Sequence, residues 1–326
     1  MSENVVDDGK QAVLKVVGVG GAGINAVNSM IDGGLKGVEC IAVSVTQPRL
    51  RKSRAAVKIC IGTGQGFGTG GDPAIARDAA LESRQSLREQ FEGADLVFIA
   101  AGMGSGTGTG ATPVVAEIAR EAGALVIGIV TKPFGFEGKQ RMLKAEAGIN
   151  ELARHADCLI TIPNDRLASN CGKGVSLLDA FKPADTVLRQ AVQGIAELVN
   201  ECGYINADFN DMKTIMSLPG KSLIGMGSAS GPNGAAEAVG MAINSPLVEA
   251  NDIQGAKGIL VNISGSAAMT MEEFDLITKT VHDKADEDAV IIVGMVVRED
   301  LGEEINVMVI ATGLDRPAGR NPLRLV

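Results

Sequence analysis

Short apolar runs alternate with longer amphipathic stretches along the first 155 residues of the chain. The apolar runs predict strands at 12–17, 39–45, 57–61, 95–101 and 125–131. Helical spacing of apolar residues predicts helices at 24–31, 72–90, from Thr112-Pro113 onward, and 137–155. Strands that alternate with helices in this way are typical of a parallel α/β sheet with helices on both faces.

A different pattern begins near Asp179, where apolar residues keep a helical spacing as far as Asn200 and predict one long central helix. Beyond Gly220 the pattern predicts a smaller α/β domain, with strands at 221–228, 257–264, 289–297 and 305–312 and helices at 234–244 and 271–284. Thr270 and Glu273 form a capping box for the second of these helices. The predicted segments are a tail (1–11), a first α/β domain (12–177), the central helix (178–203), a connecting loop (204–219), a second domain (220–315) and a tail (316–326).

The composition limits the function further. A chain of 326 residues has room for two domains, and its formal charge of −9 argues against general binding of nucleic acid or anionic membranes. Eight Phe, one Tyr and no Trp leave little scope for stacking on bases. The N-terminus is polar and acidic, unlike a signal peptide, and no apolar run reaches the ~20 residues of a membrane span. These features predict a cytoplasmic protein without direct membrane insertion.

Cysteine and histidine give no sign of a metal site. The five cysteines form no CxxC pair, and we expect them to be small buried hydrophobes in a reducing compartment. They are Cys40, Cys60, Cys158, Cys171 and Cys202. The only histidines, His155 and His282, stand apart from any Cys/His cluster, so we expect both to be structural.

Glycine is the exceptional residue, with 42 in the chain, and three glycine-rich loops at 18–23, 62–71 and 102–110 each follow a predicted strand. Because the carboxyl ends of parallel strands meet at one edge of a sheet, the three loops should converge on one ligand. Backbone N–H groups of such loops, together with the N-terminus of the next helix, bind anions. We expect Thr112 to cap the helix after the third loop. The alternative is that these glycines only permit tight turns.

The first loop also matches the G-x-G-x-x-G fingerprint of dinucleotide-binding proteins. An NAD site needs, in addition, a carboxylate at the end of the second strand to hold a ribose hydroxyl. That strand ends in Ser44-Val45-Thr46, and Glu39 lies at its beginning. No Lys follows the glycines, which excludes a Walker loop. An NAD-linked enzyme is therefore a disfavoured alternative.

Several motifs of the chain closely resemble FtsZ, the bacterial tubulin-like division GTPase family. They lie at 18–26, 100–110, 131–141, 161–165, 193–197 and 206–211, and the resemblance runs from about residue 12 to 315. It implies a tubulin/FtsZ-like α/β fold, with a parallel-sheet nucleotide-binding domain, a long central helix and a smaller C-terminal α/β domain. It further implies GTP and GDP as ligands and Mg²⁺ held mainly through phosphates and water. The head-to-tail filaments would act at the division septum or at another filament-forming site under the inner membrane.

The same resemblance implies which residues bind GTP. They are Gly20, Gly21, Ala22, Gly23, Ile24, Asn25, Gly70, Gly71, Gly104, Ser105, Gly106, Thr107, Gly108, Thr109, Glu137, Arg141, Asn164 and Asp185. The three loops would hold the phosphates, while Asn25 would face the guanine and Asn164 the ribose or base. Glu137 and Arg141 would contact the ribose and the phosphates; the alternative for this pair is a surface ion pair. Asp185 would accept from the N1 and N2 donors of guanine, which adenine lacks.

Catalysis is implied for Asn206, Asp208 and Asp211, whose carboxylates would polarise the water that attacks the nucleotide of the next subunit. The alternative for these residues is a solvated acidic loop. A catalytic site that two subunits share would make GTP hydrolysis depend on assembly. A head-to-tail contact that does not close produces an open filament.

The chain departs from the family pattern on its nucleotide-binding face. Ser44-Val45-Thr46 stands where an Asn-Thr-Asp segment is usual, Pro48 and Arg49 follow it, and Ser105 replaces a glycine. The loop at 62–71 is one residue short. These changes predict slow GTP turnover and leave two interpretations open. One is a division GTPase; the other is a paralogue, such as a magnetosome-associated one, that is a structural or regulatory filament subunit and can join a conventional FtsZ in mixed filaments.

The C-terminus departs as well. The chain ends eleven residues after Asp315, without the family's usual linker and terminal peptide. Either a natural tail-less form or a truncated product would explain this, and the missing peptide puts the usual tail-binding membrane tethers in question as partners.

Overall fold

The structure is a computed structural model that describes residues 11–62, 68–169, 177–200, 208–245 and 253–314. Six parallel strands form its first part, in the order β3-β2-β1-β4-β5-β6. Their bounds are β1 Leu14–Val19, β2 Val38–Ser44, β3 Val57–Cys60, β4 Leu96–Gly102, β5 Leu125–Lys132 and β6 Cys158–Pro163. The five predicted strands are confirmed within two residues, and β6 is an additional strand that the sequence analysis did not identify.

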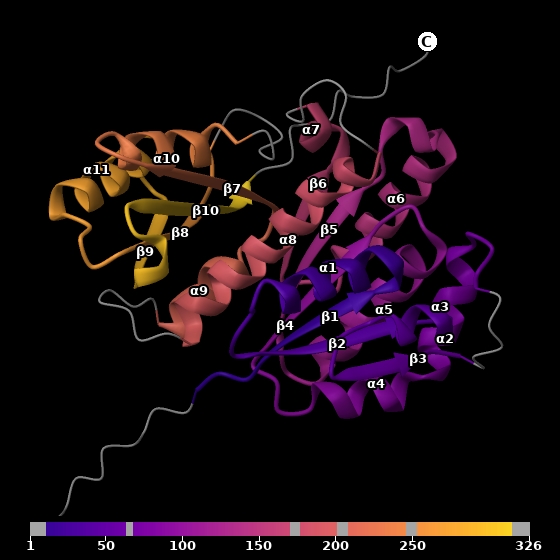
Figure 1. Cartoon of the computed structure of the whole chain (residues 1–326). Coiled ribbons are helices and arrows are strands. Elements are labelled where there is room, and N and C mark those ends of the chain that lie inside the picture. Colours follow the sequence, from indigo (N-terminus) through magenta and orange to yellow (C-terminus); the bar gives the residue numbers. More distant parts are fainter. Residues whose placement is uncertain (1–10, 63–67, 170–176, 201–207, 246–252, 315–326) are drawn as a thin grey trace, which may run out of the picture.

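Helices cover both faces of this sheet, as the alternating pattern predicts (Figure 1). Side chains such as Val16 and Phe98 pack towards α1 (Gly20–Asp32) and α8 (Leu177–Asn200). Their strand neighbours Val17 and Ile99 point to the opposite face. That face is covered by α3 (Pro73–Glu82), α4 (Arg84–Phe91), α5 (Gly106–Glu121) and α6 (Lys139–Leu152).

Several helix boundaries differ from the prediction. α1 begins at Gly20 and α5 at Gly106, so both helices start inside the loops. The expectation that Thr112 caps α5 is wrong, because Ser105 Oγ accepts the Gly108 N–H at 3.1 Å and thereby caps the helix earlier. Thr112 lies inside α5, and its hydroxyl donates to the Gly108 carbonyl.

Two predicted helices are interrupted. The helix expected at 72–90 is divided at Ser83 into α3 and α4, and Ser83 Oγ accepts the Gly62 N–H at 2.9 Å. The helix expected at 137–155 consists of the 3₁₀ turn η1 (Gly135–Glu137) followed by α6. Gly138 has φ +97°, a left-handed conformation that no α-helix contains, and it therefore separates the two.

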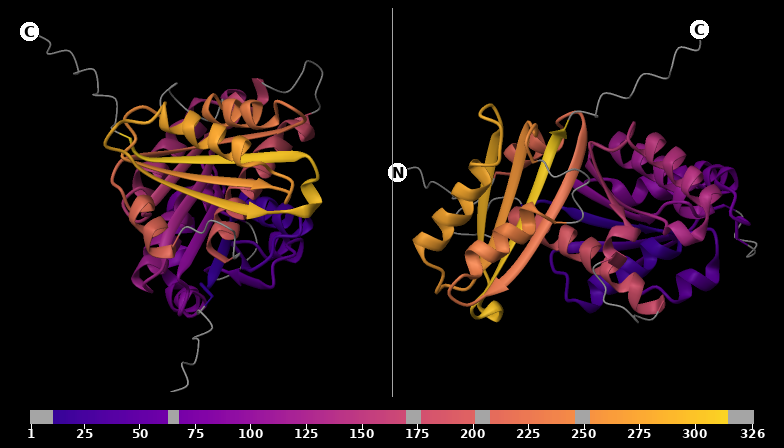
Figure 2. Two further views of the ribbon diagram at one scale, coloured as in Figure 1. Left: turned by 90° about the vertical axis from the view of Figure 1, so that its left-hand side faces the viewer. Right: turned by 90° about the horizontal axis from the view of Figure 1, so that it is seen from above.

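The second α/β domain also has the predicted elements. Its strands are β7 (Lys221–Ser230), β10 (Glu304–Leu314), β8 (Gly258–Gly265) and β9 (Val290–Val297), in that spatial order. β10 runs antiparallel to β7 and β8, and β8 is parallel to β9. Helices α10 (Gly234–Ile243) and α11 (Met271–His282) cover one face (Figure 2). The capping box of α11 is confirmed, with Thr270 N–H donating to Glu273 Oε2 at 2.8 Å.

The long helix α8 lies between the two sheets (Figure 1). Its apolar side chains, Leu188, Ala191, Val192 and Ile195 among them, share one core with Ile224, Leu260, Met308 and Ile310 of the C-terminal sheet. Asn262 Nδ2 also donates to the Gly194 carbonyl of α8 at 3.0 Å. Direct strand pairing between the two sheets is limited to Ile160 with Ser222. α8 is thus the main link between them.

The remaining elements are short. They are α2 (Gln47–Arg51), α7 (Asn164–Ser169), α9 (Phe209–Met216) and the 3₁₀ turn η2 (Glu299–Leu301). The domain boundaries stay predictions, and both predicted tails fall almost entirely outside the described residues. Among the helices of the described residues, none combines the length and apolar character needed to cross a membrane.

The prediction that the cysteines are buried is confirmed for two of the three that the structure describes. Cys40 and Cys158 are buried, and burial raises the pKa of each thiol to about 11. Cys60 is half-buried, while Cys171 and Cys202 lie outside the described residues.

Two helix glycines provide a test of this packing. A Cβ at Gly110 of α5 would overlap the Pro73 carbonyl of α3, whereas a Cβ at Gly240 of α10 would meet no atom within 4 Å. Both substitutions to Ala gain the same helix propensity. We expect Gly110→Ala to lower the free energy of unfolding by ~1–3 kcal/mol or more, and Gly240→Ala to raise it by ~0.5–1 kcal/mol. Urea denaturation of the two variants measures this, and equal shifts would contradict the packing described.

Candidate functional site

A cavity of about 810 Å³ opens at the carboxyl edge of the parallel sheet. Its wall is built from segments that follow β1, β2, β3, β4, β5 and β6, and from one side of α8. Gly21, Thr46, Gly106, Asn164 and Asp185 come from five of these segments. The described parts of all three glycine-rich loops reach this cavity, as their spacing along the chain predicted.

Close backbone packing places two helix N-termini at the cavity. A Cβ at Gly23 would overlap the Ala100 carbonyl, and one at Gly108 would overlap the Gly102 carbonyl. Because these residues are glycines, α1 and α5 can start directly against β4. No side chain caps α1, so the first N–H groups of this helix have no side-chain acceptor. Such an N-terminus attracts an anion.

The loop at 68–71 closes one side of the cavity. Gly70 and Gly71 have φ values of +56° and +79°, which only glycine adopts readily. Thr69 is buried against the start of α5, since a Cβ at Gly106 would overlap its hydroxyl. Lys144 Nζ donates to the Gly71 carbonyl at 2.6 Å. These contacts hold the loop beside the N-terminus of α5.

Charged side chains line the middle of the cavity. Arg141 pairs with Glu137, with 2.6 Å between Nη1 and Oε2, and Glu137 Oε1 accepts the Phe134 N–H at 2.9 Å. The ion pair therefore exists, and it forms part of the cavity wall rather than an isolated surface contact.

Two polar side chains at the other end of the cavity from the glycine-rich loops, Asn164 and Asp185, have unusual environments. Asn164 is buried, and its Oδ1 atom has no hydrogen-bond partner in the described part of the chain. Asp185 lies about two turns into α8 and is half-buried. Burial raises the pKa of its carboxyl from 3.8 to about 6. A ligand that donates hydrogen bonds to both groups would relieve these costs.

Family models match the chain in two places. The GTPase domain of the Tubulin/FtsZ family matches residues 13–172, and the C-terminal domain of the FtsZ family matches residues 220–315. The FtsZ of M. jannaschii, solved as an empty dimer, is 41% identical over 93% of this chain and 88% of its own, with a TM-score of 0.88.

The chain belongs to the FtsZ family.

Further solved structures agree with this assignment. A point mutant of the M. jannaschii FtsZ is 40% identical, with a TM-score of 0.88, and covers 93% of this chain and 92% of its own. CetZ2 from Haloferax volcanii, solved as a GTPγS-bound protofilament, has a TM-score of 0.76 over 93% of this chain and 94% of its own. At 20% identity, CetZ2 supports the fold alone. The predicted tubulin/FtsZ-like α/β fold is thus confirmed.

The GTP-site residues predicted from the FtsZ resemblance fall into three groups. Twelve of them line the cavity, namely Gly21, Ala22, Gly70, Gly71, Gly104, Ser105, Gly106, Thr107, Glu137, Arg141, Asn164 and Asp185. Gly20, Gly23, Ile24, Gly108 and Thr109 are buried around the starts of α1 and α5. Asn25 is exposed on α1 outside the cavity lining.

Two of the altered positions use their hydroxyls internally. Ser44 is fully buried, does not line the cavity, and accepts the Thr46 N–H at 3.2 Å. Its expected place beside the nucleotide is therefore wrong. Ser105 Oγ caps α5 and donates to the Gly102 carbonyl at 3.1 Å. Thr46 lines the cavity without capping α2 through its side chain, and its hydroxyl lies 3.3 Å from Ser44 Oγ.

Sequence reasoning did not assign Lys144 to the site. It lies three residues after Arg141 on α6, and Glu137, Arg141 and Lys144 are spaced as one helical face would be. This spacing was the signal that could have identified it. Arg49, noted only as a departure, also lines the cavity.

Two of the three predicted catalytic residues lie in the described part of the chain, and Asn206 lies outside it. Asp208 caps α9 by accepting the Asn210 N–H at 3.2 Å, and Asp211 is exposed in the first turn of α9. Neither Asp208 nor Asp211 lines the cavity of its own chain.

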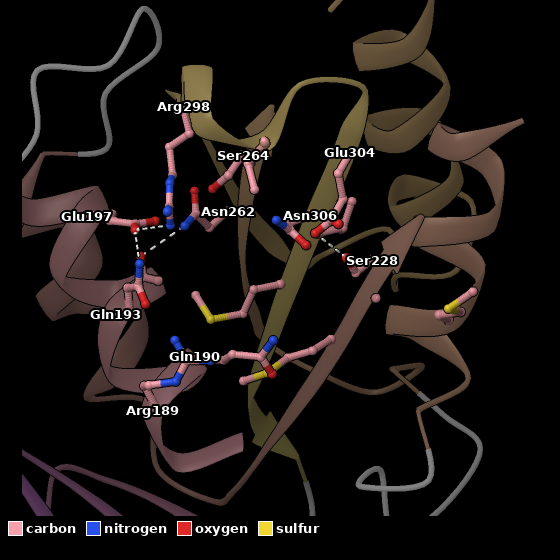
Figure 3. A pocket seen from close by; sticks show the side chains of 17 residues that line it. Arg189, Gln190, Gln193, Glu197, Ser228, Asn262, Ser264, Arg298, Glu304 and Asn306 are labelled. Atoms are coloured by element: carbon pink, nitrogen blue, oxygen red, sulfur yellow. Dashed lines mark hydrogen bonds and ion pairs between the residues drawn. The ribbon is translucent and has the colours of Figure 1, made fainter. Parts of the chain in front are cut away.

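A second cavity, of about 480 Å³, lies between α8 and the C-terminal sheet (Figure 3). Some of its polar side chains are already paired: Glu197 Oε1 accepts from Arg298 at 3.1 Å and from Gln193 at 2.7 Å. Asn262 also lines this cavity, and its Oδ1 atom has no hydrogen-bond partner among the described residues. Ser228 donates to Glu304 at 2.8 Å. It has neither a glycine-rich loop nor a helix N-terminus, so the first cavity is the better site for a phosphate.

Both histidines lie in the described part of the chain, and their structural role stays a prediction. In the ranges that the structure describes, no three His, Cys, Asp or Glu side chains form a group that could hold a metal ion. His155 faces Glu151 at 3.7 Å on α6.

The raised pKa of Asp185 predicts a pH-dependent stability. Between pH ~4 and ~6 the Asp185 carboxyl is protonated in the folded state and ionised in the unfolded state. The free energy of unfolding therefore decreases as the pH rises from ~4 to ~6. We expect Asp185→Asn to increase the free energy of unfolding at pH 7.5 by ~1–3 kcal/mol, with little change at pH 4.5. Denaturation at both pH values checks this. Asp275→Asn, an exposed site on α11, is the control, and a gain that is equal at both pH values would contradict the burial argument.

Proposed function

We propose that this FtsZ-family chain binds GTP in the 810 Å³ cavity, assembles head to tail into filaments, and hydrolyses GTP at the contact between subunits. One observation carries the proposal: two helix N-termini, the partnerless oxygen of Asn164 and the half-buried carboxyl of Asp185 face the same cavity. These groups are complementary to a ligand with phosphates at one end and hydrogen-bond donors at the other.

The phosphate end is rich in backbone N–H groups. The first turns of α1 and α5 and the backbone of Gly70 and Gly71 would surround the phosphates, and Lys144 would add a positive charge. The uncharged oxygen ligands available there are the hydroxyls of Thr46 and Thr107. This donor set suits Mg²⁺ that is bound mainly by phosphates and water. When bound, Mg²⁺ supplies neutralisation of the phosphate charge.

The base end supports a preference for guanine. An ionised Asp185 can accept hydrogen bonds from both the N1 and N2 donors of guanine, and adenine has neither. Asn164 Oδ1 can accept from a ribose hydroxyl, which would satisfy its buried oxygen. Glu137 and Arg141 lie between the two ends and would contact the ribose and the phosphates.

Asp208 and Asp211 support hydrolysis between subunits. Both carboxylates are exposed and lie outside the cavity of their own chain, so they are free to meet the cavity of a neighbour. Similar proteins have been solved as a dimer and as a protofilament with GTPγS. We propose the same arrangement here, with a role in cell division at the septum.

A second candidate is a filament subunit that binds GTP but hydrolyses it slowly. Thr46 favours this candidate, because it presents a hydroxyl at the cavity where the family pattern has a carboxylate. Loss of one preorganised electrostatic group typically reduces a rate by ~10²–10³. Such a subunit would act as a structural or regulatory component.

GTP turnover measured against protein concentration tests the proposal. If two subunits form the catalytic site, phosphate release per subunit should be near zero below a threshold concentration and rise above it, together with light scattering. Constant turnover per subunit at all concentrations, without assembly, would contradict a shared site. An absence of guanine nucleotide binding would contradict the whole proposal.

A mixing experiment separates two proposed roles of a subunit, which are to bind its own nucleotide and to supply carboxylates to the nucleotide of its neighbour. The partner is a conventional FtsZ whose own catalytic loop is disabled by substitution. We expect the wild-type chain to restore GTP turnover in mixed filaments and Asp211→Ala to restore ~10²-fold less or none. The matched control is Asp275→Ala, which alters a carboxylate on α11. If mixed filaments form and the wild type restores nothing, the acidic loop has no catalytic role.

A further inference from the structure

Arg49 brings a positive charge to the N-terminus of α1. It belongs to the short helix α2, is exposed, and lines the 810 Å³ cavity. Its guanidinium lies directly against the α-carbon of Gly21, because a Cβ at this glycine would overlap Arg49 Nη1. The guanidinium therefore lies beside the first N–H groups of α1.

Arg49 differs from the other two cations of the cavity. Arg141 is paired with Glu137, and Lys144 is bound to the Gly71 carbonyl. Arg49 has no carboxylate within ion-pair distance among the described residues. The last cavity-lining residue before Arg49 in the chain is Thr46, three residues earlier. An acid at position 46 would be placed to pair with Arg49, whereas Thr46 leaves the guanidinium available.

The positive charges of Arg49 and of the N-terminus of α1 together favour binding of an anion between them. A cation at a helix N-terminus is unfavourable, since the free N–H groups already carry partial positive charge. An anion between the guanidinium and α1 would be stabilised by both, and Arg binds phosphate through two parallel hydrogen bonds. Asn164 is far from Arg49 in the sheet order: β1, β4 and β5 lie between β2, which Arg49 follows, and β6, which Asn164 follows. Arg49 is thus at the end of the cavity opposite Asn164.

We propose that Arg49 binds the terminal phosphate of the nucleoside triphosphate and so distinguishes GTP from GDP. This inference rests on the proposed GTP site and adds a residue that the family pattern does not supply. A cation provided by the same chain offsets part of the phosphate charge. The guanidinium thus supplies part of the positive charge that a metal ion, held with the help of a carboxylate at position 46, would otherwise bring to the phosphate.

The test compares the affinities of GTPγS and GDP for four proteins, at concentrations below any rise in light scattering. They are the wild type, Arg49→Ala, Arg49→Lys and Arg51→Ala. Arg51 is the matched control because it is an exposed arginine on the same helix and does not line the cavity. We expect Arg49→Ala to bind GTPγS ~10- to 100-fold more weakly and GDP within about twofold of wild type. Arg49→Lys should be intermediate, and Arg51→Ala unchanged.

Each other outcome has a distinct meaning. Suppose that the wild type binds both nucleotides, and that Arg49→Ala leaves both affinities unchanged or weakens both equally. Arg49 then does not contact the terminal phosphate, and the inference fails while the proposed GTP site stands. If the wild type binds neither nucleotide, the proposed function fails and the inference with it. Thermal melting of the unliganded variants excludes misfolding as the cause. Should Arg49→Ala melt early, Arg49→Gln, which keeps most of the side chain, is measured in its place.

Discussion

The close approach of glycine backbones at the ends of β1 and β4 determines the architecture of the site. Gly23 lies against the Ala100 carbonyl, and Gly108 against the Gly102 carbonyl, at distances that leave no room for a Cβ atom. Because of this contact, α1 and α5 begin immediately at the strand ends instead of after a longer connection. Their N-termini then point into the same cavity. The same packing explains why so many glycines of the family motifs are buried rather than exposed to a ligand.

This packing has an electrostatic consequence in an acidic protein. The chain carries a formal charge of −9, yet the cavity collects two positive helix ends and three cationic side chains. The acidic side chains among its lining residues are Glu137, which is paired with Arg141, and Asp185 on α8. The site is therefore polarised along its length, with anion-binding groups at one end and hydrogen-bond acceptors at the other. A ligand fits in one orientation only.

The sequence predicted most of the fold because apolar runs and glycine loops are local signals. Strand positions agree within two residues, and the resemblance to FtsZ identified most of the cavity lining. The starts of α1 and α5 were predicted too late, at Ile24 and Thr112, because glycine usually indicates a loop. Here glycine occurs in the first turns of both helices because of close tertiary contacts, which the sequence alone does not reveal. Lys144 and Arg49 were not assigned because their roles depend on neighbours from other elements. β6 was not identified because Thr161 interrupts its apolar run and Pro163 ends it.

The position of α8 has a consequence for folding. Its apolar side chains complete the core of the parallel sheet and also cover the inner face of β7, β8 and β10. Each sheet on its own would therefore expose a large apolar face, and neither half of the chain has a complete core without this helix. Since the helix cannot leave one sheet without uncovering the other, the two halves should unfold as a single cooperative unit. A cut in the chain after α8 would leave a C-terminal fragment that aggregates through Ile224, Leu260, Met308 and Ile310.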